Sequence, residues 1–514
     1  MSKASIFQLL IIALFVSCFQ CVYGDDEIPS EAKMFTVPIP MFMGTLQPFV
    51  GIINQIMSNI PSVPVVGDPR SSYALADCAD LLAKASDQVD STLRAAQSPS
   101  ESKVNGTGDV QSDMRIWLSA ASTNQETCMQ GCEGVNPNVV SSLLNTINQL
   151  NAIMQQTLSM ISQVPAFGGI PPARGLAESE LPEWLPTHQR KLLQESALVA
   201  DIVVAQDGTG DYFTIMDAVN ATFDYSETRV VIYVKSGIYD EYVEIPSQKW
   251  NIMLVGDGVD NTIITGNRSV GDGFTTYNSA TFAVNGRGFF GRDITFENTA
   301  GPEKFQAVAF RGDSDLSVLH RCRFQGYQDT LYAHTLRQFY KDCEIHGTVD
   351  FIFGNAAAVF QNCDIQLKRN LPGKSNVVTA QGRIDPNQPT GFSLQFCNVT
   401  AELDSSPDLG AIMGYLGRPW KNFSRTVVMQ SHLSDAIDPA GWLEWRDTMN
   451  LDTLFYAEYE NWGAGSNVTE RVTWPGYRVI TSSFDAYNFT ASQLIDGDYW
   501  LPTVGVPYFS GLDA

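Results

Sequence analysis

Two carboxylates and two amides recur at a fixed interval in the middle of this chain. The segments Gln306–Phe310, Gln328–Tyr332 and Asp350–Gly354 begin 22 residues apart. A fixed period of this length is typical of a solenoid, in which each repeat forms one coil that stacks on the previous coil. Parallel strands lie about 4.8 Å apart, so residues one period apart become neighbours in one column. We therefore expect these four side chains to share a patch about 10 Å tall, the size of an active site.

The side chains of this patch suit nucleophilic and acid–base chemistry on an ester. An ionised carboxylate held close to a carbonyl carbon can attack it, and we assign this role to Asp350. Arg418 is its expected partner, because a nearby guanidinium lowers a carboxylate pKa and fixes its orientation. Two neighbouring carboxylates in a partly dry cleft do not ionise together, so Asp329 is expected to have a raised pKa and to act first as acid and then as base. Gln306 and Gln328 can donate N–H groups to an oxyanion.

Purely structural roles for the same residues remain open. An isolated Asp is usually a turn or surface residue, and the two Gln side chains also fit a hydrogen-bond ladder inside a solenoid. A Ser-His-Asp hydrolase has little support, since the chain contains no Gly-x-Ser-x-Gly segment and only five His.

A second repeat places Cys at the same point of four short strand patterns. Cys322, Cys343, Cys363 and Cys397 lie 21, 20 and 34 residues apart, the last step being lengthened by a Pro- and Gly-bearing insert at 372–391. Because side chains alternate between the faces of a strand, each Cys points inward with the apolar residue two positions later. These thiols fit a stack of small core residues. Neighbouring coils also lie within the Cα separations that a disulfide needs, so we expect a bridge between Cys343 and Cys363.

The residue composition and the spacing of apolar residues change near residue 200. Beyond Asp201, short runs of β-branched and aromatic residues alternate with Gly, Asn and Asp turns, which predicts an all-β fold. From Ser71 to Met160, apolar residues instead recur at three- and four-residue steps, as expected of an α-helical bundle.

Five segments resemble the signature segments of plant pectinesterases, also called pectin methylesterases. Gly237–Glu241 and Leu416–Trp420 join the three segments above, in the family order, and the likeness covers Ala197 to Ser510. The resemblance implies a right-handed parallel β-helix that hydrolyses the galacturonate methyl esters of pectin and releases methanol, without a metal or organic cofactor.

The resemblance also implies roles for individual residues. It gives Asp329, Asp350, Gln306, Gln328 and Arg418 the same catalytic roles that their chemistry suggests. It adds a substrate-binding Thr upstream of the first Gln, which Thr276 matches, and it includes Gln306 and Arg418 in substrate binding. Trp420 offers a flat apolar face for a sugar ring, although a single Trp fits a core position equally well.

Two other functions fit the same pattern. A β-helix with paired carboxylates is also expected of a polygalacturonase, whose acid and base flank a glycosidic bond. Such an enzyme creates reducing ends and releases no methanol. Alternatively, the chain is a non-catalytic wall-binding or inhibitory protein.

The N-terminal half suggests an exported precursor. Residues 1–24 have the apolar run and small final residue of a secretory signal peptide. Residues 25–164 include segments around Cys78 and Cys128 that resemble the second half of a pectinesterase-inhibitor domain, and the likeness implies a Cys78–Cys128 bridge. The earlier Cys pair of that family has no counterpart here, which leaves an inhibitory role open. A metal site at Cys78, Cys128 and Cys132 is not expected in an exported chain without a nearby His.

A linker is expected at 165–194, where Pro and Gly are frequent. It ends in Arg190-Lys191-Leu-Leu193, a site at which a processing protease is expected to cut. The secreted form would then begin near Gln194 to Ala197 and contain the β-helix domain at 195–514. Export also agrees with the Asn-x-Ser/Thr sequons, which begin at Asn105, Asn220, Asn267, Asn398, Asn422, Asn467 and Asn488.

The charge of the chain bears on its partners. The formal net charge is −24, so the precursor should repel polyanions. We expect no nucleic-acid partner and a preference for highly esterified pectin. We also expect a monomeric mature form that acts outside the cell, in the cell wall, and that is a target for a separate proteinaceous pectinesterase inhibitor.

Overall fold

The computed structural model describes residues 46, 51–53, 69–98, 106–135, 137–163, 199–402, 411–446 and 449–512. The expected signal peptide and the expected processing site at Arg190–Leu193 lie outside these residues.

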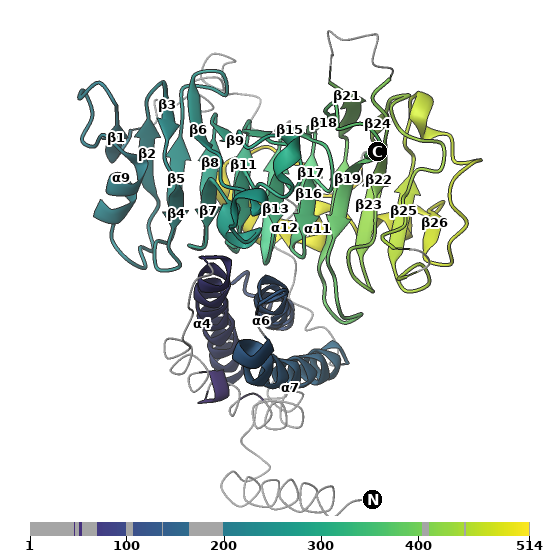
Figure 1. Cartoon of the computed structure of the whole chain (residues 1–514), viewed down its shortest axis with the longest axis horizontal. Helices are drawn as coiled ribbons and strands as arrows, with labels where there is room; N and C mark the ends of the chain where they lie inside the picture. Colours follow the sequence, from purple (N-terminus) through teal and green to yellow (C-terminus); the bar gives the residue numbers. More distant parts are fainter. Residues whose placement is uncertain are drawn as a thin grey trace, which may run out of the picture.

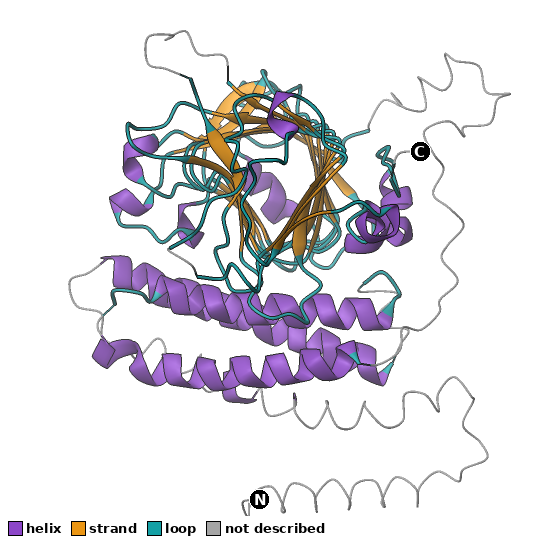
Figure 2. Cartoon of the chain, turned by 90° about the vertical axis from the view of Figure 1, so that its right-hand side faces the viewer, coloured by secondary structure: helices purple, strands orange, loops and turns teal. Residues whose placement is uncertain are grey.

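Within residues 199–402, 411–446 and 449–512, the chain forms a parallel β-helix built from three long sheets, which Figure 2 shows nearly end-on. Sheet A has 11 strands in the order β1 (Ile202–Val204), β2 (Val230–Val234), β5 (Ile252–Val255), β8 (Phe290–Arg292), β11 (Ser317–His320), β14 (Arg337–Lys341), β17 (Ala357–Gln361), β20 (Gly391–Gln395), β23 (Arg425–Met429), β25 (Phe455–Tyr459) and β26 (Tyr477–Val479).

The other two sheets complete each coil. Sheet B has eight strands, namely β3 (Gly237–Asp240), β6 (Thr262–Gly266), β9 (Thr295–Asn298), β12 (Arg323–Gln325), β15 (Glu344–Gly347), β18 (Asp364–Leu367), β21 (Asn398–Ala401) and β24 (His432–Leu433). Sheet C has seven, namely β4 (Val243–Ile245), β7 (Phe282–Val284), β10 (Phe310–Gly312), β13 (Leu331–Ala333), β16 (Ile352–Gly354), β19 (Asn376–Gln381) and β22 (Gly414–Gly417). Strands pair in parallel with those of the next coil, so the predicted all-β solenoid is confirmed.

A single residue in the left-handed backbone conformation turns the chain from sheet A into sheet B. Arg321, Asp342, Asn362 and Phe396 have φ of 52°, 54°, 57° and 56°. Each comes directly before one of the repeated Cys residues. A left-handed residue other than Gly costs roughly 1–2 kcal/mol, so the packing inside the coil must offset this cost at every corner.

The predicted disulfide between Cys343 and Cys363 is wrong. Both thiols are free and 1% exposed, and each donates to backbone carbonyls, as in the 3.3 Å contact from Cys343 Sγ to Leu319 O. The two residues occupy equivalent positions on neighbouring coils, where the side chains of parallel strands point the same way about 4.8 Å apart. A disulfide instead needs Cβ atoms that approach to roughly 3.8 Å. The alternative interpretation, a stack of small core residues, is correct.

Three long helices form the N-terminal part, α4 (Pro69–Gln97), α6 (Val110–Gly131) and α7 (Pro137–Ser162). The Cys78–Cys128 disulfide joins α4 to α6, as the resemblance implied. Cys132 lies close to this bridge, but two of the three sulfur atoms are bonded to each other and cannot act as thiolate ligands. A membrane-spanning helix is not found within the described ranges, since every helix there is too short or too polar for that role.

The long helices are in direct contact with the β-helix and bury part of its outer surface. Figure 1 shows α4 and α6 directly below the coils of the middle of the β-helix. One buried apolar cluster contains residues of both helices together with Tyr332 and Phe353 on the outer face of sheet C. On another side, sheet A is covered by α11 (Ala491–Leu494) and α12 (Gly497–Val504). The short helix α9 (Ile215–Ala221) lies near one end of the β-helix, and α10 (Ser483–Tyr487) shares an apolar cluster with β23 and β25.

Candidate active site

The predicted site residues lie in successive loops that lead from sheet B into sheet C. Thr276 is in the loop before β7, Gln306 in the loop before β10, Gln328 and Asp329 in the loop before β13, and Asp350 in the loop before β16. Because the strands stack in register, these loops stack as well.

Backbone hydrogen bonds hold the loops against one another. The Val270 N–H donates to Gln306 O at 2.9 Å, the Ala307 N–H to Gln328 O at 3.2 Å, and the Asp329 N–H to Val349 O at 3.0 Å. These contacts bring the predicted patch together from four coils.

The register differs from the predicted 22-residue step by one residue. Leu331 pairs with Ile352, a step of 21, so Asp329 and Asp350 occupy equivalent positions on neighbouring coils. Both Asp residues have left-handed backbone, with φ of 62° and 52°. Asp tolerates this conformation better than most residues other than Gly. The two carboxyl groups are therefore held by equivalent tight turns, one directly above the other.

Arg418 follows β22 and reaches Asp350 across the coils. Its Nε and Nη2 donate to the two oxygens of Asp350 at 2.7 and 2.6 Å. The Arg418 side chain is 22% exposed and that of Asp350 is 6% exposed. The guanidinium also lies over the ring of Trp445, 4.4 Å from its centroid. Trp445 was missed by the sequence interpretation, because no repeat or motif marks it.

The pKa values of both carboxyl groups are raised, and that of Asp329 is raised more strongly, as expected. Burial raises the pKa of Asp329 well above its usual range, the charge of Asp350 raises it further, and Arg418 opposes the shift. Burial also raises the pKa of Asp350, against the lowering effect of Arg418. The sequence analysis predicts a lowered pKa at Asp350, and this prediction is wrong. Asp350 is almost completely removed from water, which disfavours its charged form, and the ion pair with Arg418 offsets only part of this effect.

The side-chain amides of Gln306 and Gln328 make no hydrogen bond within the described part of the chain, and both residues are half-buried. A Gln ladder does exist elsewhere in the solenoid. Gln361 Nε2 donates to Gln395 Oε1 at 3.1 Å, and Gln395 Nε2 donates to Gln430 Oε1 at 3.2 Å. The amides near Asp329 do not join this ladder, which leaves their donors available to a ligand.

An aromatic row continues from the carboxylates along the outer face of sheet C. The rings of Tyr332 and Phe353 stack with centroids 4.1 Å apart, and Phe353 meets Trp420 edge-on at 5.9 Å. Trp420 is half-buried and packs over Gly382, where a Cβ atom would approach its ring to 2.8 Å. A half-buried indole next to a charged pair can offer one face to a ligand.

Helix α4 contacts the loop that carries Thr276. The Thr275 hydroxyl donates to the Asp77 carboxylate. Lys84 Nζ donates to the hydroxyl oxygen of Tyr277 at 2.5 Å and to Asn285 Oδ1 at 2.7 Å. These contacts place α4 against the upstream end of the site.

Helix α6 contacts the site from the opposite end. Lys421, next to Trp420, pairs with Glu126 at 2.5 Å. The Thr127 hydroxyl lies 2.7 Å from Nε2 of the buried His334, whose Nδ1 contacts Asp313. The bridged residues Cys78 and Cys128 directly follow Asp77 and Thr127, so the disulfide ties the two contact regions to each other.

Comparison with known proteins agrees with this geometry. The sequence profile of the family described as "Pectinesterase" matches residues 201–498. The chain belongs to the pectinesterase family. A second profile, "Plant invertase/pectin methylesterase inhibitor", matches residues 49–163, so this pectinesterase carries an inhibitor-type region before its β-helix.

Relatives share both regions of this pectinesterase. The "Pectinesterase/pectinesterase inhibitor PPE8B" of Prunus persica is 48% identical over 512 residues, which are 98% of this chain and 96% of the relative. The "Probable pectinesterase/pectinesterase inhibitor 32" of Arabidopsis thaliana is 48% identical and covers 100% of this chain and 98% of its own. A solved structure, "Pectin methylesterase from Carrot", has 53% identity and a TM-score of 0.60, and covers 61% of this chain and 99% of its own.

Proposed function

We propose that this pectinesterase hydrolyses galacturonate methyl esters in pectin through a covalent intermediate on Asp350. The Arg418–Asp350 pair carries the proposal. The two-pronged contact fixes the plane of the carboxylate and stabilises its ionised form inside a nearly dry site. An ionised oxygen held in this way is suited to attack the ester carbonyl carbon.

Asp329 handles the protons in both halves of the reaction. Its raised pKa keeps it protonated, so it can transfer a proton to the methoxide oxygen when the carbon–oxygen bond breaks and methanol leaves. The Asp329 carboxylate then removes a proton from the water that attacks the Asp350–acyl bond. This step releases the galacturonate carboxylate, frees Asp350 and restores the proton on Asp329.

The two amides and the flanking residues complete the reaction site. Gln306 and Gln328 donate N–H groups to the oxygen that becomes negative in each tetrahedral intermediate. Thr276 and Trp420, on either side of the carboxylates along the coils, hold the neighbouring sugars, with Gln306 and Arg418 in contact with the reacting residue. All of these steps use side chains of this chain.

Methanol release and new reducing ends, measured on the same pectin sample after the linker is cut and the helical region separated, test the proposal. We expect methanol and no reducing ends, and we expect Asp350→Ala to abolish methanol release. Asp435→Ala, at an exposed turn, is the matched control. New reducing ends without methanol would instead support a polygalacturonase, and an Asp350→Ala variant as active as the wild type would overturn the assignment of the nucleophile.

We further propose that the chain is exported to the cell wall, where pectin lies, and is cut between Arg190 and Leu193. The Cys78–Cys128 bridge supports an oxidising route, because disulfides persist in secreted proteins. Sequencing of the secreted protein from its N-terminus is the test. A start near Gln194 to Ala197 is expected, and a start near Asp25 would contradict the processing step.

We also propose that the helical region closes the substrate cleft until it is removed. The Asp77 carboxylate on α4 accepts a hydrogen bond from the hydroxyl of Thr275, which is next to Thr276. Glu126 on α6 forms an ion pair with Lys421, which is next to Trp420. A polymer cannot reach these positions while the helices are docked. Methanol release should therefore rise when the linker is cut and the helical region separated, and equal rates before and after separation would contradict this role.

A further inference from the structure

Three arginines meet where α6 packs against the loop between β19 and β20. Arg115 belongs to α6, Arg383 to the start of this loop, and Arg425 is the first residue of β23. Their guanidinium groups donate to five consecutive carbonyls of the loop. Arg115 Nη2 donates to Asn387 O at 3.0 Å, Arg383 to Pro386 O and, at 2.9 Å, to Gln388 O, and Arg425 to Pro389 O and, at 2.7 Å, to Thr390 O. The three cations therefore surround one short loop at the interface with the helical region.

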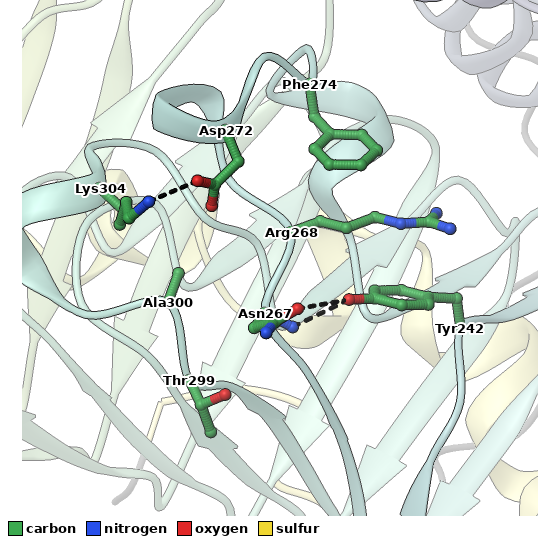
Figure 3. Close-up of a pocket in the computed structure, with 8 residues that line it drawn as sticks. All are labelled: Tyr242, Asn267, Arg268, Asp272, Phe274, Thr299, Ala300 and Lys304. Carbon is green, nitrogen blue, oxygen red and sulfur yellow. Dashed lines mark hydrogen bonds and ion pairs between the residues drawn. The ribbon is translucent and has the colours of Figure 1, made fainter.

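This cluster lacks the carboxylate partners that cations have elsewhere in the chain. Lys304, for example, pairs with Asp272 at a surface pocket (Figure 3). Within the part of the chain that the structure describes, none of the three arginines forms an ion pair. Asp385 lies in the same loop, but its Oδ1 accepts from the backbone and side-chain N–H groups of Asn387, at 2.8 and 3.0 Å. Backbone carbonyls alone contact the three charges.

The cluster holds more positive charge than its surroundings stabilise. Burial lowers the pKa of Arg425 well below its usual range, and the charges of Arg383 and Arg115 lower it further. Burial also lowers the pKa of Arg383 to about 10, with Arg115 adding to the shift and Asp385 opposing it. Burial lowers the pKa of Arg115 as well, although Asp496 opposes this. An anion at this position would favour the charged form of all three groups.

Several donors of the cluster remain for a ligand. Arg115 Nε is buried and has no hydrogen-bond partner among the described residues. The Nη1 atoms of Arg115, Arg383 and Arg425 likewise donate to no described residue. A buried charged donor without an acceptor disfavours the folded arrangement unless a water or an ion accepts from it. The three side chains are only half-buried, so a small ligand can approach them from solvent.

We propose that Arg115, Arg383 and Arg425 form a binding site for a tetrahedral oxyanion such as inorganic phosphate or sulfate. Guanidinium groups donate paired hydrogen bonds to such anions. Donors that come from three elements suit a ligand whose acceptor oxygens point in several directions.

The site includes residues of both regions of the chain. A bound oxyanion would contact α6 through Arg115 and the β-helix through Arg383 and Arg425, so it would stabilise the docked arrangement by mass action. The ion would thus act as an effector of docking. This goes beyond the proposed function, since the three arginines lie outside the proposed catalytic residues.

Calorimetric titration of inorganic phosphate into the full chain tests the site directly. Wild type should bind one equivalent, and Arg115→Gln should weaken binding by at least about tenfold, the effect of losing a charge-assisted hydrogen bond. Arg115→Lys keeps the charge without the fork of donors and should restore only part of the affinity. Arg94→Gln, on the exposed face of α4, is the matched control and should bind as wild type does. Equal phosphate binding by wild type and Arg115→Gln would overturn the inference.

Thermal unfolding of the full chain tests the effect on docking. Phosphate at ten times its Kd should lower the unfolding constant of the docked chain about elevenfold and raise the unfolding midpoint. Arg115→Gln should gain less than about twofold, whatever its stability without phosphate. Because phosphate and sulfate stabilise folded proteins generally, this variant supplies the baseline for both ions. A gain of the same size in Arg115→Gln would overturn the inference.

The choice of ion separates a specific site from screening of charge. Sodium sulfate should act as phosphate does, whereas sodium chloride at the same ionic strength should not. An equal gain with chloride would overturn the inference. Neither measurement requires methanol release, so a failure here and a failure of the proposed function are distinguishable.

Discussion

The Arg418 guanidinium donates two parallel hydrogen bonds, of 2.7 and 2.6 Å, to the carboxylate of Asp350. Arg418 directly follows β22, which lies two strands further along sheet C than β16, the strand that Asp350 precedes. This contact counteracts the burial that raises the pKa of Asp350. The guanidinium is itself held by the ring of Trp445. The orientation and the charge of the proposed nucleophile therefore depend on one residue.

Arg418→Lys should lower kcat by at least about tenfold, because a lysine cannot reproduce the two-pronged contact. The pKa of Asp350 should rise further as it loses part of its counter-charge. The acidic limb of the pH–rate profile should then move to higher pH. Methanol release measured as a function of pH checks both effects. Arg478→Lys, on the terminal strand β26 of sheet A, is the control. An unchanged acidic limb in Arg418→Lys would contradict the role of the pair.

Asp329→Asn should lower kcat by about 10² to 10⁴, the usual contribution of a general acid–base. Asp329 must hold its proton for the first step, so activity should fall as the pH rises through its raised pKa. That alkaline limb should disappear in Asp329→Asn, because the amide does not titrate. A variant that keeps the wild-type alkaline limb would show that another group supplies the proton.

Asp77 should make docking of the helical region depend on pH. Burial raises the pKa of Asp77 to about 6 in the docked state, although the Thr275 hydroxyl lowers it. A free Asp ionises near 3.9. Between these values the free carboxyl loses its proton while the docked one keeps it, so docking weakens as the pH rises from about 4 to about 6. The loss is at most about 3 kcal/mol.

Gel filtration of the chain after the linker is cut checks this pH dependence. The two parts should elute together more completely at pH 4 than at pH 7. Asp77→Asn cannot ionise, so its elution should change less over the same range. A wild type that separates more readily at pH 4 would contradict the sign of the effect.

The four Cys residues inside the β-helix should react as free thiols once the protein is unfolded. Alkylation in denaturant without a reductant, followed by peptide mass spectrometry, should modify Cys322, Cys343, Cys363 and Cys397. Among the Cys residues that the structure describes, only Cys78 and Cys128 should remain bridged. A reductant should consequently destabilise the helical region and leave the unfolding of the β-helix unchanged. A Cys343–Cys363 cross-linked peptide would contradict the structure.

Much of the fold was determined by the sequence alone. A solenoid repeats its contacts once per coil, so the intervals between Gln306, Gln328 and Asp350 and between the Cys residues were enough to predict stacked parallel strands. The helical period of residues 71–160 likewise predicted α4, α6 and α7. These patterns are local, because each depends only on which residues recur along the chain.

The tertiary structure decided the contacts between coils and between the two regions. Strand pairing set the register at 21 residues, which stacks Asp329 on Asp350, and kept the Cys side chains parallel instead of bridged. Burial raised the pKa of Asp350 despite Arg418. Periodicity states which residues recur, but their distances, their removal from water and their long-range partners arise only when the coils stack and the helices dock.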